Sequence, residues 1–329
     1  MKQPLFSVDT EHIKSEMNRL ASKKKPFLVG VNYELTKGFL IENPLSQTDI
    51  QFAVKGIGNA ERRHNQTTTI EFKSHPLDYA CYKNRFDIIH RGLKQGYSFL
   101  SNLTMKTPIE TSLQLKDIFE LSTAPYRLHI PDEFVCFSPE RFVKIENGVI
   151  SSNPMKGTID ASIPDAEEKI LNDFKETAEH NTIVDLIRND LSIVASDVRV
   201  KRFRYIDKIQ AKGKEILQVS SEIEGSLPPD YPDRLGDIFF SLLPAGSICG
   251  APKAATISLI RSAEGEDRNF YTGVFGYFDS EVFDSAVLIR FIEKDGEQMY
   301  YRSGGGITAY SRCEDEYDEV LNKIYLPFV

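Results

Sequence analysis

The stretch FYTGVFGYFDSEVFDSAVLIRFIEKDGEQMYYRSGGGIT, residues 270–308, decides the fold of this chain. It contains three runs rich in β-branched and aromatic residues, a composition typical of strands. The Asp295-Gly296 pair separates the second run from the third, and this dipeptide favours a tight hairpin turn. We therefore expect an antiparallel meander with strands at FYTGVFGYF (270–278), SAVLIRFIEK (285–294) and EQMYYRSGG (297–305).

The regions before and after this meander add short strands and several helices. Residues 1–75 are rich in strand patterns, and Asn147-Gly148 predicts a second two-residue hairpin between RFVKIE and GVISSN. Apolar spacing near 3.6 residues, with proline, glycine and cap residues at the ends, predicts helices over 76–95, 113–122, 166–195 and 315–325. Gly96 would end the first of these helices, and Thr111 and Ser112 are candidate caps of the second.

Nothing in the sequence marks a boundary between domains. The 329 residues contain no linker, low-complexity segment or internal repeat. Division of the length by about 150 suggests two domains, but this ratio is a weak guide. We therefore predict one large α+β domain, residues 1–329, in which antiparallel sheets are packed between helices.

Composition excludes several classes of protein. The chain has 40 Lys and Arg against 48 Asp and Glu, a net charge of −8, which argues against a nucleic-acid surface or an anionic membrane surface. The four cysteines stand far apart, so they predict neither a disulfide framework nor a zinc site. The N-terminus lacks the apolar core of a signal peptide, and no apolar run approaches the ~18 residues of a membrane span. We expect a soluble, cytoplasmic protein.

Two pairs of glutamates are spaced so that each pair projects from one helix face. Glu176 and Glu179 are three residues apart in the longest predicted helix, and Glu316 and Glu319 have the same spacing in the last one. Carboxylate oxygens of this kind are the ligands that Mg²⁺ prefers. For either pair alone, a solvated helix face is the more ordinary explanation, and Lys323 would then form a routine salt bridge with Glu319.

Glycine-rich segments and a turn lysine form a second group of candidates. The triplet Gly304-Gly305-Gly306 follows a strand, and GSICGAPK (246–253) leads into a helix. Both segments can bring backbone N–H groups close to an anion, although flexible turns explain them equally well. Lys156, in the turn PMKGT (154–158), is either an exposed lysine or a nucleophile with a lowered pKa. Glu140, in SPER, is by itself an ordinary surface carboxylate.

Six segments together resemble one enzyme family. They occur in the order found in chorismate-utilising enzymes, which include anthranilate synthase component I, aminodeoxychorismate synthase component I, and the isochorismate and salicylate synthases. The segments are AEHNTIVDLIRND (178–190), GSICGAPK (246–253), YTGVFGY (271–277), the run around Arg290, SGGGI (303–307) and EYDEVLNK (316–323). The resemblance implies an anthranilate synthase component I-like domain, with residues 76–329 as its motif-bearing core and residues 1–75 as a shortened N-terminal part.

Two positions separate the branches of this family. The turn reads PIAGT in anthranilate synthases and PIKGT in aminodeoxychorismate synthases, and PMKGT resembles the second. By this resemblance, Lys156 attacks C2 of chorismate and ammonia then adds at C4. Water-adding members carry a lysine base at the position that matches Leu100 here. The resemblance thus implies 4-amino-4-deoxychorismate, on the route to 4-aminobenzoate and folate, as the product. Anthranilate formation and a catalytically inactive chorismate-binding protein remain the alternatives.

The resemblance also implies roles for the other motif positions. Glu140 would be the general acid for the departing C4 hydroxyl, and Lys323 would help to keep Lys156 neutral. Gln218 stands where many relatives have a histidine, so a histidine-dependent loss of pyruvate is not expected. Ammonia would come from a separate glutamine amidotransferase subunit, component II. The implied Mg²⁺ ligands are Glu176, Glu179, Glu316 and Glu319, and the implied substrate-binding residues are Tyr271, Arg290, Gly304, Gly305, Gly306, Ser247, Thr158 and Lys323.

Overall fold

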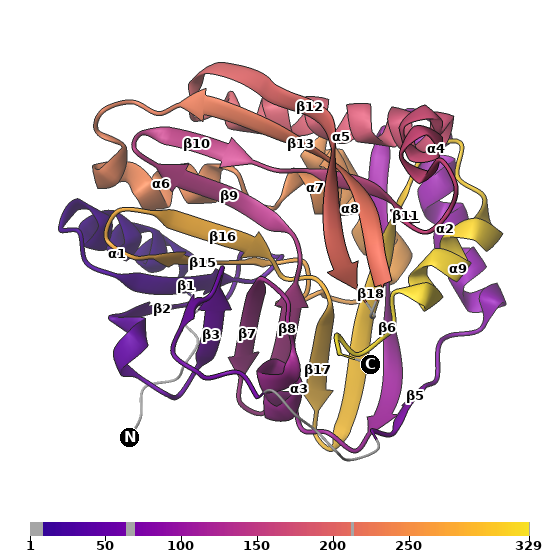
Figure 1. Cartoon of the computed structure of the whole chain (residues 1–329), viewed down its shortest axis with the longest axis horizontal. Coiled ribbons are helices and arrows are strands. Elements are labelled where there is room, and N and C mark those ends of the chain that lie inside the picture. Colours follow the sequence, from indigo (N-terminus) through magenta and orange to yellow (C-terminus); the bar gives the residue numbers. More distant parts are fainter. Residues whose placement is uncertain (1–8, 64–69, 212–213, 329) are drawn as a thin grey trace.

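Two antiparallel sheets of nine strands each form the centre of the protein. The computed structural model describes residues 9–63, 70–211 and 214–328. Strands β9, β10 and β16 of the first sheet run across the view in Figure 1, whereas β7, β8, β17 and β6 of the second sheet run up and down it. The chain is a single domain of antiparallel sheets covered by helices, as its sequence predicts.

The first sheet has the strand order β11-β13-β10-β9-β16-β15-β1-β2, and β12 pairs with β13. Its strands are β1 (Phe27–Val31), β2 (Gly38–Glu42), β9 (Arg141–Glu146), β10 (Val149–Ser152), β11 (Met155–Asp160), β12 (Ser196–Ala211), β13 (Lys214–Ser226), β15 (Val274–Phe278) and β16 (Phe283–Val287).

The second sheet has the order β14-β6-β18-β17-β8-β7-β3-β4, and β5 pairs with β6. Its strands are β3 (Gln51–Val54), β4 (Ile57–Gly58), β5 (Phe72–Ser74), β6 (Leu100–Thr111), β7 (Tyr126–Ile130), β8 (Phe134–Ser138), β14 (Gly250–Ala251), β17 (Phe291–Asp295) and β18 (Gln298–Ile307).

Helices cover the outer faces of both sheets. Apolar residues of α1, α5 and α6 pack on the first sheet, and those of α2, α3, α8 and α9 pack on the second. An aromatic core that includes Phe52, Tyr126 and Phe275 fills the space between the sheets. The helices are α1 (Thr10–Ser22), α2 (Tyr79–Lys94), α3 (Leu115–Leu121), α4 (Ala166–Asn172), α5 (Phe174–Leu191), α6 (Leu235–Ser241), α7 (Gly246–Cys249), α8 (Lys253–Glu264) and α9 (Cys313–Asn322), with 3-10 turns at Pro44–Ser46 and Tyr231–Arg234.

The predicted meander differs from the structure at its second strand. SAVLIRFIEK is not one strand, because the chain leaves the first sheet after Val287 and enters the second at Phe291. Arg290, expected on a strand, lies in this connector with a φ of 54°, which breaks an extended chain. The first strand of the meander is also shorter than predicted and begins at Val274. The stretch that decides the fold therefore joins the two sheets.

The longest predicted helix, residues 166–195, is two helices. Asp173 has an extended ψ of 120°, and its side chain accepts a hydrogen bond from the backbone N–H of Glu176. An aspartate in this position is a strong N-cap, so it ends α4 and begins α5. The break matters for the site because Glu176 lies in the first turn of α5 and Glu179 lies one turn later.

Local turn signals were more reliable than helix ends. Asn147 and Gly148 have φ values of 52° and 75° and join β9 to β10, which confirms the predicted hairpin. Gly96 follows the end of α2 with a φ of 78°, also as predicted. Asp78 rather than Pro76 caps α2, and Gln114 rather than Thr111 or Ser112 caps α3, because the side chain of each accepts a hydrogen bond from a backbone N–H of the first turn. The helix expected at 315–325 occupies Cys313–Asn322.

Several elements were missing from the sequence prediction, among them β7 and α6. Helix α1 lies within the part of the chain predicted only as strands, and the long β12–β13 hairpin was not predicted at all. Part of the TTTIEFK strand falls outside the described residues, and the rest forms β5. Within the described ranges, no helix is long and apolar enough to cross a membrane.

Candidate active site

The candidate site lies beside the glycine-rich end of β18, where one neighbouring strand stops. Strand β6 pairs with β18 as far as Ile307, but β17 pairs with it only as far as Arg302. Residues 303–307 therefore have one edge that β17 does not cover. Most of the predicted site residues approach this edge.

Two of the three glycines direct their backbone groups toward this edge. The ammonium of Lys323 donates a hydrogen bond of 2.8 Å to the carbonyl of Gly304, so the polar groups of Gly304 face away from β6. Because alternate residues of a strand face the same neighbour, the N–H of Gly306 points the same way, and that of Gly305 points toward β6. We expected all three glycines to offer N–H groups to a substrate. The strand geometry leaves only the N–H groups of Gly304 and Gly306 on the side away from β6.

Helix α5 brings the first glutamate pair to the lysine turn. Lys156, near the start of β11, forms an ion pair of 2.9 Å with Glu179. The following residue, Gly157, has a φ of 85°, and a Cβ there would lie 3.1 Å from Oε2 of Glu176. Both glutamates thus lie against the turn that carries Lys156.

Helix α9 brings the second pair to the other side of the glycine strand. Glu319 pairs with Lys323 at 2.6 Å, and Glu316 is buried. A Cβ on Gly305 would lie 3.4 Å from Oε1 of Glu319 and 3.6 Å from Oε2 of Glu316. These are ordinary van der Waals distances, so both carboxylates lie directly against the strand at Gly305.

The side chains of Lys156 and Leu100 lie beside Gly306 of the same strand. A Cβ on Gly306 would lie 3.6 Å from Nζ of Lys156 and 3.3 Å from Cδ1 of Leu100. Leu100 is buried at the start of β6. An apolar side chain and an amine therefore flank one glycine.

The charges of the site act differently on its two lysines. Burial lowers the pKa of Lys156, but the negative charges of Glu179, Glu319 and Glu176 outweigh burial and raise it above its ordinary value. Burial lowers the pKa of Lys323, and the charges of Lys156 and Arg290 lower it further. This arrangement differs from the expectation that Lys323 keeps Lys156 neutral, because the charges of three nearby glutamates act on Lys156. Burial and the charge of Glu179 also raise the pKa of Glu176.

Glu140 lies on the loop before β9, where its carboxylate accepts a hydrogen bond of 2.8 Å from the hydroxyl of Ser247. Burial raises the pKa of Glu140, against the opposing effects of Ser247, Lys156 and Lys323. A raised pKa favours the protonated form of the carboxyl group, which suits a general acid. Ser247 is held in place because Lys253 of the same segment forms an ion pair of 3.0 Å with Asp190 at the end of α5.

The predicted clamp residues lie near one another at the connector between the sheets. Arg290 donates a hydrogen bond of 3.1 Å to the carbonyl of Lys323, and its guanidinium lies 4.9 Å from the centre of the Tyr325 ring. Tyr271 is buried, and burial raises the pKa of its hydroxyl, while the charges of Arg268, Arg302 and Arg290 oppose that rise. Sequence reasoning missed Tyr325, although its position two residues after Lys323 was a signal.

Thr158 differs from the other predicted residues because its side chain is exposed. It lies beyond Gly157 on β11, opposite Gln218 of β13. The irregular register between Met155 and Thr158 separates it from the regular pairing at the start of the strand. The structure therefore gives Thr158 less support as a substrate-binding residue than it gives Ser247 or Lys323.

The residues present fit a magnesium ion by their chemistry. All four glutamates offer hard carboxylate oxygens, and the two lysine ammonium groups already in contact with Glu179 and Glu319 show that the group attracts cations. Among the described residues, no three His, Cys, Asp or Glu side chains lie close enough together to hold an ion as they stand. The carboxylates would have to draw together around it.

Comparison with known proteins agrees with this geometry. A family model of chorismate binding enzymes matches residues 21–327. The chain belongs to this family. The six segments that carry the resemblance, among them GSICGAPK and the glycine strand, predicted the same family from sequence.

Relatives within the family have several names. A Haemophilus influenzae protein named an uncharacterized PabA-like protein is 45% identical over 96% of this chain and 97% of its own length. Aminodeoxychorismate synthase component 1 of Salmonella typhimurium is 30% identical over 74% of this chain and 56% of its own. Anthranilate synthase component 1 of Archaeoglobus fulgidus is 36% identical over 66% and 52%.

The fold is also similar to solved structures. The menaquinone-specific isochorismate synthase of Escherichia coli is 14% identical and superposes with a TM-score of 0.71, over 97% of this chain and 82% of that one. At this identity the likeness shows the fold alone.

Proposed function

We propose that this chain is component I of aminodeoxychorismate synthase, which converts chorismate and ammonia to 4-amino-4-deoxychorismate and water. The observation that carries the proposal is the pair of side chains that flank Gly306. Lys156 offers an amine beside this glycine, and Leu100 offers no base that activates water. The similarity to the Salmonella typhimurium enzyme supports the same activity.

In this proposal Glu179 first takes the proton that the raised pKa keeps on Lys156. The neutral amine then attacks C2 of the chorismate ring, the ring double bond shifts, and the C4 hydroxyl leaves as water. Glu140 donates the proton for that departure, and its raised pKa suits this role. Ammonia then adds at C4, and the reverse shift of the double bond expels Lys156. The two steps replace one difficult substitution, which is the advantage of covalent catalysis.

The remaining residues would bind the dianionic substrate. Arg290 and Tyr271 would hold the enolpyruvyl carboxylate, and the N–H groups of Gly304 and Gly306 would meet the ring carboxylate. A Mg²⁺ ion held by Glu176, Glu179, Glu316 and Glu319 would supply positive charge beside that carboxylate. Ser247 would add a hydrogen bond, and Lys323 a further positive charge near the glycine strand.

Ammonia would reach the site from a glutamine amidotransferase subunit. This part of the proposal rests on the family alone. Its test is the glutamine-dependent activity of the purified chain with and without such a subunit, compared with the activity from ammonium. We expect activity from glutamine only when the subunit is present, and activity from ammonium without it.

Anthranilate formation is the second candidate, and one observation favours it. The Archaeoglobus fulgidus anthranilate synthase component is more similar in sequence, at 36% identity, than the Salmonella typhimurium aminodeoxychorismate synthase component, at 30%. The lysine at position 156 argues against it, because direct attack of ammonia at C2 needs space that a small side chain leaves free. A third candidate, an inactive chorismate-binding protein, would bind chorismate without converting it.

Product analysis separates the three candidates. Purified protein is incubated with Mg²⁺, chorismate and ammonium, and a lyase that releases 4-aminobenzoate from aminodeoxychorismate is added afterwards. We expect 4-aminobenzoate, and only after the lyase is added. Anthranilate as the main product would overturn the proposal in favour of the second candidate, and unchanged chorismate would favour the third.

A further inference from the structure

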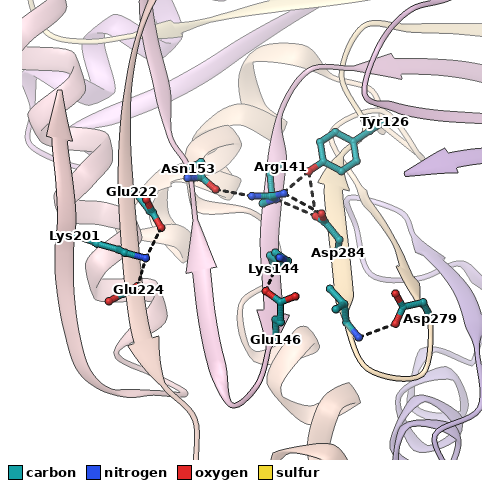
Figure 2. Close-up of polar contacts among 11 residues, drawn as sticks. Tyr126, Arg141, Lys144, Glu146, Asn153, Lys201, Glu222, Glu224, Asp279 and Asp284 are labelled. Carbon is teal, nitrogen blue, oxygen red and sulfur yellow. Dashed lines mark hydrogen bonds and ion pairs between the residues drawn. The ribbon is translucent and has the colours of Figure 1, made fainter. Parts of the chain in front are cut away.

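Arg141, the residue after Glu140, holds four polar contacts behind the candidate site. Its Nη1 donates a hydrogen bond of 2.8 Å to Oδ1 of Asn153, and its Nε donates one of 2.9 Å to the hydroxyl of Tyr126. Nε and Nη2 each lie 3.0 Å from a carboxylate oxygen of Asp284. Figure 2 shows the guanidinium between Asn153 on one side and Tyr126 and Asp284 on the other.

These contacts join three parts of the fold. Arg141 begins β9, Asp284 lies on the adjacent β16, and Tyr126 begins β7 of the second sheet. Asn153 belongs to the two-residue connection between β10 and β11, three residues before Lys156. The guanidinium of Arg141 is therefore bonded to the connection that leads to Lys156, and Arg141 itself directly follows Glu140 in the chain.

The charge of Arg141 is already matched. Asp284 receives both of its charged contacts in a bidentate arrangement, and the side chains are 21% and 11% exposed. The lysines that act on Glu140 are Lys156 and Lys323. The effect of Arg141 on the site is therefore geometric, through the positions that its hydrogen bonds fix.

We propose that Arg141 is a positioning residue that sets the distance between the Glu140 carboxyl and the Lys156 amine, through its hydrogen bond to Asn153. The inference rests on the proposed function for the roles of those two groups. Displacement of a reacting group by about 1 Å can slow a reaction by about 100-fold. Loss of the contact therefore lowers the turnover of chorismate more than it lowers the affinity for it.

Three variants separate this role from a purely structural one. Asn153→Ala removes the hydrogen bond from Arg141 and also the contact of Asn153 with Tyr205. Arg141→Lys keeps a positive charge beside Asp284 but lacks the planar fork that reaches Asn153 and Tyr126. Lys144→Met, on the same strand, removes the ion pair with Glu146 and is the matched control. We expect kcat for chorismate consumption to fall about 10- to 100-fold in the first two, with KM little changed, and to stay unchanged in the control.

The double variant Arg141→Lys/Asn153→Ala tests whether the two residues act through one contact. We expect its kcat to be no lower than that of the worse single variant, because the contact can be lost only once. If the fold-losses in kcat of the two single variants multiply in the double variant, the inference is overturned. The inference would also be overturned if the variants kept the wild-type kcat and only their unfolding temperature fell.

A second readout does not depend on the reaction. The rate at which trinitrobenzenesulfonate labels Lys156, measured by peptide mass spectrometry, should rise several-fold in Asn153→Ala, because the turn is no longer held. Labelling of Lys253, which is paired with Asp190, should not change. If the wild type does not consume chorismate, the proposed function fails, and labelling still decides the role of Arg141. Equal labelling of Lys156 in both proteins would overturn that role.

Discussion

Two groups of charged residues in this protein are built in opposite ways. At the end of α8, Arg268 and Glu264 form a bidentate pair at 2.6 and 2.8 Å, with side chains that are 1% and 2% exposed. Their remaining groups bond to the backbone of Asn102 and Thr104. At the glycine strand, four glutamates share two lysines. One group is balanced, and the other keeps an excess of negative charge.

This difference indicates what each group is for. A balanced pair with every hydrogen bond made fixes structure, because loss of either partner leaves a buried charge alone. An unbalanced group is costly to fold unless a cation or substrate joins it, and perturbed charges of this kind gather at functional sites. We therefore expect variants of the first group to change stability, and variants of the second to change activity.

The largest effect is expected at Lys156. Lys156→Ala should lower the production of aminodeoxychorismate from ammonium by more than about 1,000-fold, as removal of a covalent nucleophile does elsewhere. Stability should fall less than in a variant of the Arg268–Glu264 pair, because Lys156 is 25% exposed and water screens the charge left on Glu179. Product formation and thermal unfolding of the same preparation measure both. Full activity from ammonium would contradict the assignment of Lys156 as nucleophile.

A smaller loss of activity is expected at Glu140. Glu140→Gln should reduce kcat by about 10²- to 10⁴-fold, the usual contribution of a general acid. The wild-type rate should fall as the pH rises through the pKa of Glu140, and burial places this fall above the ordinary range of a glutamate. A pH–rate profile checks this. A wild-type profile that is flat over the range of glutamate titration would argue against this acid.

A variant of the balanced Arg268–Glu264 pair should lose stability rather than activity. Glu264→Gln leaves the buried guanidinium of Arg268 without its counter-charge, and we expect the free energy of unfolding to fall by about 3–5 kcal/mol. Glu266→Gln is the matched control, because this nearby glutamate is more exposed and should contribute less than about 1 kcal/mol. Denaturant unfolding of both variants measures the difference. Equal losses would remove the distinction between the two groups.

A buried neutral residue gives a third point of comparison. His129 bonds to Gln51 at 2.9 Å, and burial lowers its pKa from 6.5 to about 4. Between pH 6.5 and about 4, His129 is protonated in the unfolded chain but neutral in the folded chain. The free energy of unfolding therefore falls as the pH drops through this range. His129→Gln should remove up to about 3 kcal/mol of this dependence. Unfolding curves at several pH values test it, and an unchanged dependence would contradict it.

Local signals in the sequence predicted local structure well. The Asn147-Gly148 hairpin and the glycine stop after α2 were correct, because both depend on backbone angles that few residues adopt. The break at Asp173 and the passage between sheets at Arg290 were missed. Periodicity continues across both, and only the packing of the whole chain selects the interruption.

The membership of the candidate site stays a prediction, and its electrostatics were not predicted from the sequence. Motif resemblance named the residues that the structure gathers around the glycine strand, including Glu140 and Ser247, which are in contact although 107 residues apart. It did not indicate that Lys156 pairs with Glu179, or that β17 stops short and uncovers one edge of β18. These features arise from strand lengths and side-chain positions that motifs do not encode.

The short connector between β16 and β17 has a consequence for how this protein can change over time. Three residues, Leu288 to Arg290, separate strands that belong to different sheets. An inserted or deleted residue here would shift the register of a strand in one sheet or the other and reverse which side chains face its core. Arg290 would move with it. Evolution can lengthen the outer loops of this fold, but it must keep the length of this connector fixed.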